Sequence, residues 1–378
     1  MSKLEALIVD FCPRGVEYKK IKDCFKRLKG TPITAGKMKE IENKNGEIRI
    51  FAGGKTVINA KEDDIPNANI TSVPAVLVQS RGIIDVVYFE SPFTFKNEMW
   101  AYTHEEKTTV KYLYYVLKNN IQQFRDSASV MGSLPQIALP VTEELLIPYP
   151  PLEIQREIVR ILDNFTELTA ELTAELTAEL TARKKQYEYY RDKLLKDNAT
   201  QNAQIMHIGD IYDFKYGTGN TIPTDGGIYP VYGSNGIVGA HHEYNSENAP
   251  VVGHIGAYAG IVNWADGKHF VTYNGVICKH KNSDVNYRFA YYLLLIQDFG
   301  SKAKNSSQPF VSYDVLKAPE VLVPPLPEQK RIVDILDRFD AVCNNISIGL
   351  PAEIEARKKQ YEYYRDKLLA FPQAELEA

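Results

Sequence analysis

The sequence predicts an α+β protein: two globular mixed α/β domains separated by two long antiparallel helices, which form a coiled-coil spacer with pseudo-twofold symmetry. Three observations predict this fold: an internal repeat, an apolar stripe of helical period in each copy, and two domain-sized segments outside the copies. At 378 residues the chain is also longer than a single hydrophobic core usually supports.

The repeat consists of two segments that lie 174 residues apart. ARKKQYEYYRDKLL occupies residues 182–195 and recurs unchanged at 356–369, and the same offset aligns 151–181 with 325–355 without a gap. Of the 45 aligned positions, 26 are identical. The chain therefore contains two copies of one long element.

Both copies have the pattern of a long helix. Apolar residues recur mainly at steps of three and four, from Ile154 to Leu194 and from Ile332 to Leu368. Pro351 can kink or restart the second helix, because proline removes a helical donor. A helix of 45 residues would be about 67 Å long. We therefore expect the two helices to bury their stripes against each other as an antiparallel pair.

The segments outside the repeat are each long enough to fold. The predicted organisation is a first globular domain at 1–150, a central spacer helix at 151–195, a second globular domain at 196–324, a C-terminal spacer helix at 325–370 and a tail at 371–378. Apolar runs between Gly and Pro turns predict strands within 74–89, 228–244 and 249–264, and helices within 110–124 and 286–299. Both domains thus have strands followed by a helix.

A low-complexity insert, TELTAELTAELTAELT, fills residues 166–181 and contains three full TAEL tetrads. Ala, Leu and Glu favour helix, and each tetrad would add about 6 Å of helix and about 40° of rotation. The acids Glu171, Glu175 and Glu179 are expected to keep the outer helix face in water. By itself the insert indicates a long solvated helix and no particular function.

Composition and charge set broad limits. The net charge is −4 with a pI of about 6.0, which argues weakly against nucleic-acid binding. The stretch from Arg14 to Lys39, however, has nine Lys and Arg against two acids, and this run is either a phosphate-binding surface or an ordinary solvated face. The N-terminus lacks the pattern of a secretory signal, and no stretch approaches 18 apolar residues, so we expect a cytoplasmic protein. Four scattered cysteines are expected to be reduced.

Taken together, these segments resemble the specificity subunit of type I restriction-modification systems, of the kind with TAEL repeats in the central spacer. The resemblance rests on PPLEIQREIVRILD at 150–163 and PPLPEQKRIVDILD at 324–337, each after a domain-sized segment, on the two ARKKQYEYYRDKLL blocks and on the TAEL tetrads. It spans essentially the whole chain, whereas the globular parts match only in layout.

The resemblance implies that the globular domains are target-recognition domains, each of which reads half of a gapped, asymmetric site on double-stranded DNA. It also implies that two methylation subunits and then restriction subunits join this chain, which is itself not catalytic. S-adenosylmethionine is expected on the methylation subunit, with no cofactor and no metal on this chain, and no membrane partner is expected.

Physics suggests how such a spacer would set the gap. Two readers on a rigid rod satisfy their half-sites at only one separation and one rotational phase. The rotation of about 40° per tetrad is close to the twist of about 34 to 36° per base pair. We therefore predict that the number of tetrads sets the length of the gap.

Exposed faces of the repeated block are the expected docking surface for partner subunits, because Tyr and Arg are favoured interface anchors. The predicted partner-binding residues are Tyr187, Tyr189, Tyr190, Arg191, Tyr361, Tyr363, Tyr364 and Arg365. The alternative is that these tyrosines only seal the helix pair.

Basic, hydroxyl and amide side chains near Gly-bearing loops are the predicted DNA-binding residues, because such groups reach base edges and phosphates. In the first domain they are Lys29, Thr31, Thr34, Lys37, Lys39, Lys55 and Thr56. In the second they are Lys215, Thr218, Asn220, Tyr232, Ser234, Asn235, Ser306, Ser307 and Gln308. The alternative for each is ordinary turn chemistry.

The sequence gives little support for a self-sufficient enzyme. GGKT at 53–56 resembles the end of a phosphate loop but has Arg49 where the first Gly should stand, and GTGNTI from Gly217 lacks the third Gly of a dinucleotide fingerprint. The run His241, His242 and Glu243 lacks the spacing of a zinc helix and predicts a polar loop. The main alternative from another class is a coiled-coil adaptor that binds proteins rather than DNA.

Overall fold

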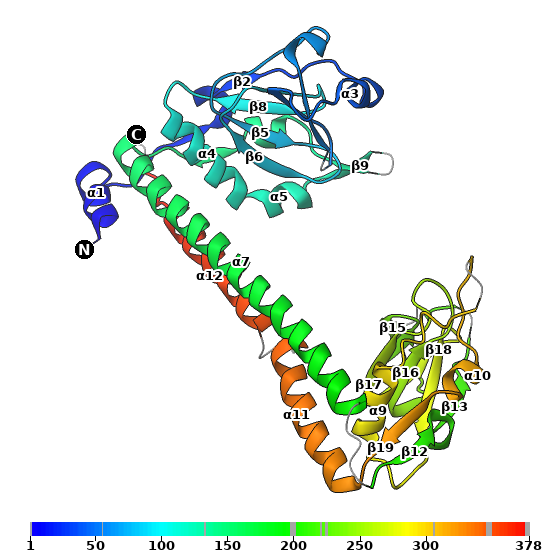
Figure 1. The fold of residues 1–378 in the computed structure, drawn as a ribbon. Coiled ribbons are helices and arrows are strands. Elements are labelled where there is room, and N and C mark those ends of the chain that lie inside the picture. The colour runs from blue at the N-terminus through cyan, green and yellow to red at the C-terminus, as the bar shows by residue number, and fades with distance from the viewer. Residues whose placement is uncertain are drawn as a thin grey trace. The chain divides into compact units, whose positions relative to one another are not determined.

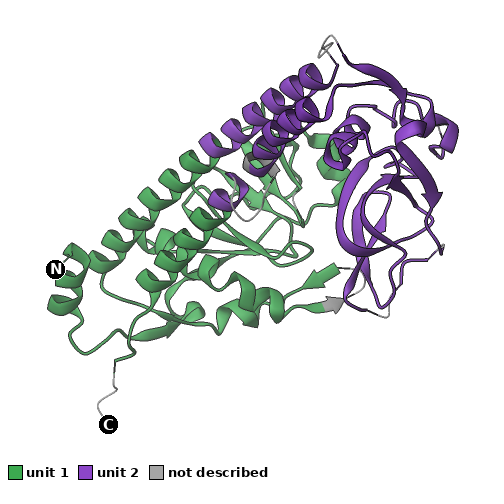
Figure 2. Cartoon of the chain, turned by 90° about the horizontal axis from the view of Figure 1, so that it is seen from below, with its two compact units in different colours: residues 1–174, 355–378 green, residues 175–354 purple. Residues whose placement is uncertain are grey.

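A computed structural model describes residues 2–54, 56–131, 134–196, 202–219, 221–223, 226–304, 307–344 and 350–374 (Figure 1). The chain divides into two compact units, coloured separately in Figure 2. Unit 1 comprises residues 1–174 and 355–378, and unit 2 comprises residues 175–354. Each unit contains one predicted globular domain together with parts of the predicted spacer helices.

Unit 1 is built on two small sheets. The four-stranded antiparallel sheet has the order β2 (Lys26–Leu28), β8 (Trp100–Thr103), β5 (Ala75–Gln79) and β6 (Asp85–Phe89). The three-stranded sheet has the order β4 (Val57–Ala60), β3 (Ile48–Phe51) and β7 (Phe93–Phe95), with β3 and β7 parallel. Two further strand pairs join β1 (Tyr18–Lys20) to β11 (Leu146–Pro148) and β9 (Ser129–Met131) to β10 (Leu134–Gln136).

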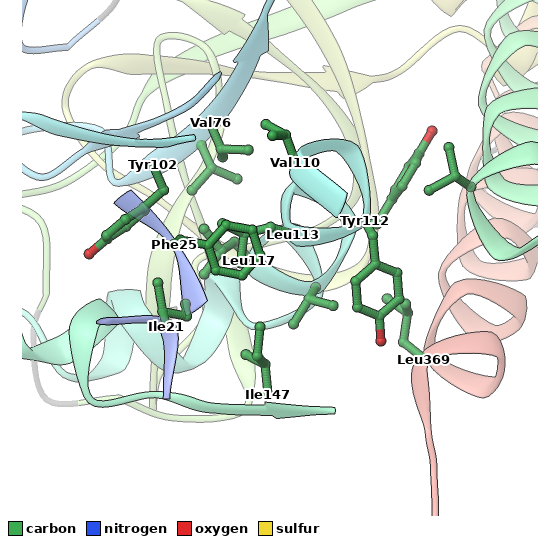
Figure 3. Close-up of a cluster of buried hydrophobic side chains, with 14 of the residues drawn as sticks. Ile21, Phe25, Val76, Tyr102, Val110, Tyr112, Leu113, Leu117, Ile147 and Leu369 are labelled. Carbon is green, nitrogen blue, oxygen red and sulfur yellow. The ribbon is translucent and has the colours of Figure 1, made fainter. Parts of the chain in front are cut away.

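Helices close the core of unit 1. The predicted helix at 110–124 is present as α4 (Lys107–Asn119) followed by α5 (Ile121–Asp126), and α4 packs its apolar face on the four-stranded sheet. Figure 3 shows Val110, Leu113 and Leu117 of α4 gathered against Val76 and Tyr102 of that sheet. The remaining helices of the domain are α2 (Ile21–Cys24), α3 (Ala35–Ile41), α6 (Pro140–Glu143) and the short 3₁₀ turn Glu62–Asp64.

Unit 2 has one six-stranded sheet. Its order is β13 (Tyr212–Tyr216), β18 (Gly275–His280), β16 (Ser246–Gly253), β17 (Val262–Val271), β14 (Tyr229–Gly233) and β15 (Gly236–His241). A separate antiparallel pair joins β12 (Gln204–His207) to β19 (Glu320–Val323). The helices are α8 (Ile208–Ile211), α9 (Tyr287–Leu295) and α10 (Tyr313–Lys317). The strands and the helix predicted for this domain are therefore confirmed.

The two globular domains have the same pattern of strand pairing, although their sequences differ. β5 pairs with β6 and β8 as β16 pairs with β17 and β18, and β2 pairs with β8 as β13 pairs with β18. The parallel pair β3–β7 has its counterpart in β14–β17. The two domains differ in one respect. In unit 2 the single long strand β17 pairs with β16, as β6 pairs with β5, and also with β14, as β7 pairs with β3. β17 therefore joins into one sheet the strands that form two sheets in unit 1.

The predicted long helices are present, and each unit holds one antiparallel pair. The central helix α7 (Leu152–Lys196) is continuous over 45 residues, whereas the second copy is divided into α11 (Leu326–Asn344) and α12 (Leu350–Leu369). Pro351 lies in the first turn of α12, where its missing N–H costs nothing. The predicted kink or restart of the second helix falls on residues 345–349, which lie outside the described residues, and stays a prediction.

In unit 1 the first part of α7 packs along the last part of α12. Tyr361 and Thr166 share a hydroxyl hydrogen bond of 3.0 Å, the ring of Tyr364 lies 6.0 Å from that of Phe165, and Leu369 is buried in the core shared with the start of α7. Positions rise along α7 as they fall along α12, so the two helices are antiparallel. In unit 2 the last part of α7 packs on α11.

An N-terminal helix, α1 (Lys3–Phe11), docks on the start of α7, which the sequence analysis did not predict. Ser2 and Glu5 form a capping box at its first turn. Lys3 Nζ lies 2.9 Å from the Glu157 carboxylate, which Arg160 also binds at 2.7 Å. Hydrogen bonds from Arg160 above all, and from Lys3, lower the pKa of Glu157 to about 2, so this nearly buried side chain stays ionised.

The C-terminal segment returns to the same region of unit 1. Val16 N–H donates to Pro372 O at 2.9 Å, and Ala374 N–H donates to Val16 O at 3.0 Å. Within the described ranges, none of the helices is long and apolar enough to cross a lipid bilayer.

Candidate nucleic-acid interface

In unit 2, five loops meet beside the ends of β13, β14, β16 and β18. We call residues 217–219, 234–235, 254–261, 272–274 and 307–312 loop cluster 2. Hydrogen bonds connect these loops: Tyr273 N–H to Gly219 O (3.0 Å), Ser234 Oγ to Ile255 O (2.8 Å) and Asn274 O (3.0 Å), and Gly256 N–H to Pro309 O (2.8 Å). The sheet therefore presents several turns as one connected surface.

Unit 1 has a corresponding arrangement. We call residues 29–34, 52–54 with 56, 80–84, 96–99 and 134–137 loop cluster 1. Its connecting bonds are Thr31 N–H to Phe95 O (2.7 Å), Lys96 N–H to Phe51 O (3.0 Å), Gly54 N–H to Arg81 O (3.3 Å), Ser80 Oγ to Glu98 O (2.5 Å) and Gly82 N–H to Pro135 O (2.9 Å). Because the strands that carry them correspond, the two loop clusters occupy the same place on the same fold.

A glycine stands at one matching position in each cluster. Gly30 follows β2 and Gly217 follows β13. A Cβ atom would lie 2.2 Å from Phe95 O at Gly30 and 2.1 Å from Thr272 O at Gly217, closer than any side chain tolerates. Only glycine lets the loop pass so near the neighbouring backbone, which fixes the first loop of each cluster in place.

The structure gathers part of the predicted DNA-binding set of the first domain in loop cluster 1. Lys29, Thr34 and Thr56 are exposed there, and Lys29 also lines a pocket of about 630 Å³. Thr34 is engaged as the N-cap of α3, where its hydroxyl accepts from Lys37 N–H. Lys37 and Lys39 lie on α3 itself, and Lys37 pairs with Glu40 at 2.8 Å. The predicted residue Lys55 lies outside the described residues.

Thr31 does not fit the role predicted for it, because it is fully buried. Its hydroxyl is 2.7 Å from that of Thr94 and accepts a 2.8 Å hydrogen bond from Asn69 N–H. Thr31 therefore holds loop cluster 1 together from inside and presents no group to a ligand in this conformation.

Loop cluster 2 brings together most of the predicted residues of the second domain. Thr218, Asn235, Ser307 and Gln308 are exposed within it. Ser234 is half-buried, and its hydroxyl is used to tie neighbouring loops. The other predicted residues divide as follows: Lys215 is exposed on β13, Asn220 and Ser306 lie outside the described residues, and Tyr232 is buried on β14.

Tyr232 is a second correction. Its ring packs edge-on against His269 inside the sheet, and burial raises the pKa of its phenol. Tyr232, predicted to bind DNA, is therefore a core residue of β14. Val231, Tyr232 and Gly233 are all buried, because β14 lies inside the sheet between β15 and β17, and local sequence does not reveal those neighbours.

The structure also adds candidates that the sequence analysis missed. Arg81 and Asn97 are exposed in loop cluster 1, and Tyr258, Tyr273 and Lys304 are exposed in or beside loop cluster 2. Arg81 precedes Gly82, a positive-φ turn residue between β5 and β6. The Arg-Gly pair between two apolar runs was a turn signal that could have identified Arg81.

The repeated block exposes the same residues in both copies. Tyr189 and Tyr363 are 61% and 62% exposed, and Tyr190 and Tyr364 are both 42% exposed. In each copy the two neighbouring tyrosine rings meet nearly edge-on. Two units of different globular sequence thus carry matched pairs of surface aromatics.

The other predicted partner-binding residues are less available. Tyr187 is 7% exposed and packs in the core of unit 2, so its ring seals the helix pair and is not part of an exposed face. Arg191 and Arg365 are mostly covered, each lying against the tyrosine four residues earlier, and Arg365 donates to Asn119 at 2.8 Å. Tyr361 is half-buried against Thr166.

Two hollows on the helices include predicted partner-binding residues. A mainly apolar groove of about 480 Å³ in unit 1 is lined by Phe165, Leu168, Thr169, Leu172, Arg357, Gln360, Tyr361 and Tyr364. A shallow polar hollow of about 610 Å³ at the end of α7 includes Tyr189 and Arg191. Among the residues whose positions are described, no three His, Cys, Asp or Glu side chains gather as a metal site requires.

Comparison with known proteins gives one consistent family. The family model described as the type I restriction modification DNA specificity domain matches this chain twice, at residues 13–182 and 201–356. The specificity subunit of a type I restriction enzyme of Escherichia coli is 34% identical over 305 residues, which are 72% of this chain and 73% of that protein. A putative type I specificity subunit of Mycoplasma pneumoniae is 33% identical over 238 residues, which are 59% of this chain and 92% of that protein.

Solved structures agree at the level of the fold. The S subunit of a type I restriction-modification system from M. genitalium is 19% identical and superposes with a TM-score of 0.50, covering 94% of this chain and 96% of that one. A chain from a structure titled for complex assembly and conformational transition of the type I R-M system is 13% identical, with a TM-score of 0.64, covering 94% of this chain and 98% of that chain.

Proposed function

This chain belongs to the family of type I restriction-modification specificity subunits, which recognise DNA sequence, and from this premise we propose that it reads a two-part DNA site with a gap. Each globular domain reads one part through its loop cluster. The observation that carries the proposal is that two domains of one topology present corresponding loop clusters with different side chains.

The different contents of the clusters support two different half-sites. Loop cluster 1 offers the basic side chains Lys29 and Arg81, whereas loop cluster 2 offers Tyr273, Asn235 and Gln308. Arg and Lys suit guanine edges and phosphates, and Asn and Gln suit adenine edges. Loops that are held by a common sheet can vary these groups without a change of fold.

The long helices would set the gap between the half-sites. The tetrads lie inside the continuous helix α7, so adding or removing one changes the length and phase of a regular helix and not of a loop. The gap is therefore proposed to follow the number of tetrads.

The matched tyrosine pairs are proposed to bind two methylation subunits. Two identical exposed blocks suit two copies of one partner, because each copy would meet the same groups. Tyr363, Tyr364 and the adjoining apolar groove offer aromatic area to a partner helix. S-adenosylmethionine and the transfer chemistry are assigned to the methylation subunits, restriction subunits join this assembly, and the chain itself is proposed to read DNA without catalysing the reaction.

The test is to co-express the chain with its methylation subunits and map methylated adenines across a genome. The expected result is one motif made of two specific parts and an unspecified gap. An unmodified genome with an intact complex would favour a protein-binding adaptor, and methylation by this chain without partners would reveal an enzyme. An ungapped motif would overturn the two-domain reading.

A further inference from the structure

One helix of each globular domain, α4 in unit 1 and α9 in unit 2, is tied to a long helix by the same set of polar contacts. In unit 1, Asp163 of α7 receives a 2.6 Å hydrogen bond from the Tyr115 hydroxyl and a 2.9 Å ion pair from Lys111, both on α4. The Lys111 ammonium also lies 5.3 Å from the centre of the Tyr88 ring on β6. One carboxylate thus connects the long helix, α4 and the sheet.

Unit 2 repeats this arrangement with different residue types. Asp337 of α11 accepts from the Tyr292 hydroxyl and pairs with Arg288 at 2.8 Å, both on α9. The Arg288 guanidinium lies 5.0 Å from the centre of the Trp264 ring on β17. Lys is replaced by Arg and Tyr by Trp, and the order of aromatic ring, cation and carboxylate is kept.

The sequence positions show that the correspondence is exact in register. Asp163 and Asp337 are 174 residues apart, the offset of the internal repeat. On α4 and on α9 the cation stands four residues before the tyrosine, which places both side chains on one helix face. The pairing partner comes from a globular domain whose sequence otherwise differs between the two units.

The tyrosines act as neutral donors. Tyr115 and Tyr292 are buried, and burial first, with the neighbouring carboxylate second, raises the pKa of both phenols well above the ordinary value. Each phenol therefore keeps its proton and donates along a fixed direction. The half-buried ion pair constrains each carboxylate from a second direction. Lys111 or Arg288 reaches it from the neighbouring turn of the same helix that carries the tyrosine.

Apolar packing already holds each domain to its long helix. Ile158 and Leu162 of α7, and Ile332 and Leu336 of α11, are fully buried against the domains. Such packing is non-directional and tolerates small rotations, whereas hydrogen bonds weaken steeply when their angle changes. The polar contacts therefore add what the apolar surface lacks, a defined angle between helix and domain.

We propose that Asp163 and Asp337 are positioning residues that fix the angle of each recognition domain on its long helix and so enforce the gap of the DNA site. This inference rests on the proposed function, since a gap must exist for its length to be enforced. Loss of either carboxylate would let the domain rotate and accept half-sites one base pair nearer or farther, a change of about 34 to 36° in phase.

The experiment measures methylation by the full complex on duplexes that carry the mapped half-sites at the native gap and at gaps one base pair shorter or longer. Asp163→Asn and Asp337→Asn are expected to lower discrimination between native and altered gaps about tenfold, the factor given by loss of a charged hydrogen bond. The preference for bases within each half-site should not change. This result would distinguish a change in the angle between domain and helix from a loss of base recognition.

Matched variants keep the outcome decisive. Asp334→Asn removes an exposed carboxylate one turn away on α11 and should leave discrimination unchanged. Should an Asn variant fail to assemble, Tyr115→Phe or Tyr292→Phe removes only the donor hydroxyl and is expected to give the same loss. Unchanged gap discrimination in the assembled variants would overturn the role of the carboxylates. A wild-type complex indifferent to gap length would instead overturn the proposed function.

Discussion

A glutamine in each copy of the Pro-Leu-x-x-Gln segment explains at the residue scale why this segment recurs. Gln155 and Gln329 are both buried, and each donates its side-chain amide to the carbonyl of the proline five residues earlier, at 2.8 and 2.7 Å. This bond closes the turn that leads into the long helix. Gln329 also donates to Asp284 O and accepts from Asn286 N–H at the start of α9.

The two glutamines make a matched pair for a stability prediction. Gln329→Leu is expected to reduce the free energy of unfolding by about 2 to 4 kcal/mol, because it leaves buried backbone groups without partners. Gln155→Leu is expected to cost less, about 1 to 2 kcal/mol, since fewer bonds are lost. Thermal unfolding of the full chain, with hydrogen exchange at Arg288 and Phe289 as a local reporter, measures both. Equal losses in the two variants would contradict the argument.

At the scale of the secondary-structure element, α7 is the helix that we propose to set the gap of the DNA site. It is one helix of 45 residues, and its middle consists of tetrads whose leucines are half-buried apart from the exposed Leu168. The second copy of the repeat has no such tetrads, and its described parts are α11 and α12. The tetrads of the central helix therefore offer a regular segment that can change length in equal steps.

Removal of one tetrad tests this element directly. Deletion of residues 173–176 shortens α7 by about 6 Å and turns the two ends by about 40°. At about 3.4 Å and about 34 to 36° per base pair, the gap should shorten by about one to two base pairs. Mapping the methylated motif gives the answer. The length-preserving control Thr173→Ala should leave the length of the gap unchanged. An active deletion variant with an unchanged gap would refute the proposal that the number of tetrads sets the gap.

At the scale of the whole molecule, charge limits how the chain can hold DNA. The net charge is −4, and many cations of the first domain are already paired, as Lys20 and Lys22 are with Glu144. These pairs lower the pKa of Glu144 to about 2 and leave less positive charge for phosphates. We therefore propose that the chain reads bases while its partners supply many of the phosphate contacts.

This division predicts a difference in salt dependence. The full complex should bind its site with a steeper loss of affinity than the isolated chain as salt rises from about 50 to about 200 mM, because each phosphate contact releases counterions. Fluorescence anisotropy with a duplex that carries the mapped motif measures both slopes. Tight and specific binding by the isolated chain at physiological salt would show that it needs no partner for its grip.

The sequence by itself determined the two long helices, their pairing and the presence of two α/β domains. A helical period is a local pattern, and an internal repeat is found by comparing the sequence with itself. Both can therefore be recognised without knowledge of contacts between distant segments. Only the tertiary structure decided that both domains share one strand pairing, that α1 docks on α7, and that Thr31, Tyr187 and Tyr232 lie inside. The burial of a loop or strand residue depends on segments far away in the chain. Residue type and local spacing do not indicate those contacts. For the same reason the sequence did not predict the roles of Asp163 and Asp337, whose partners lie on α4 and α9, far away in the chain.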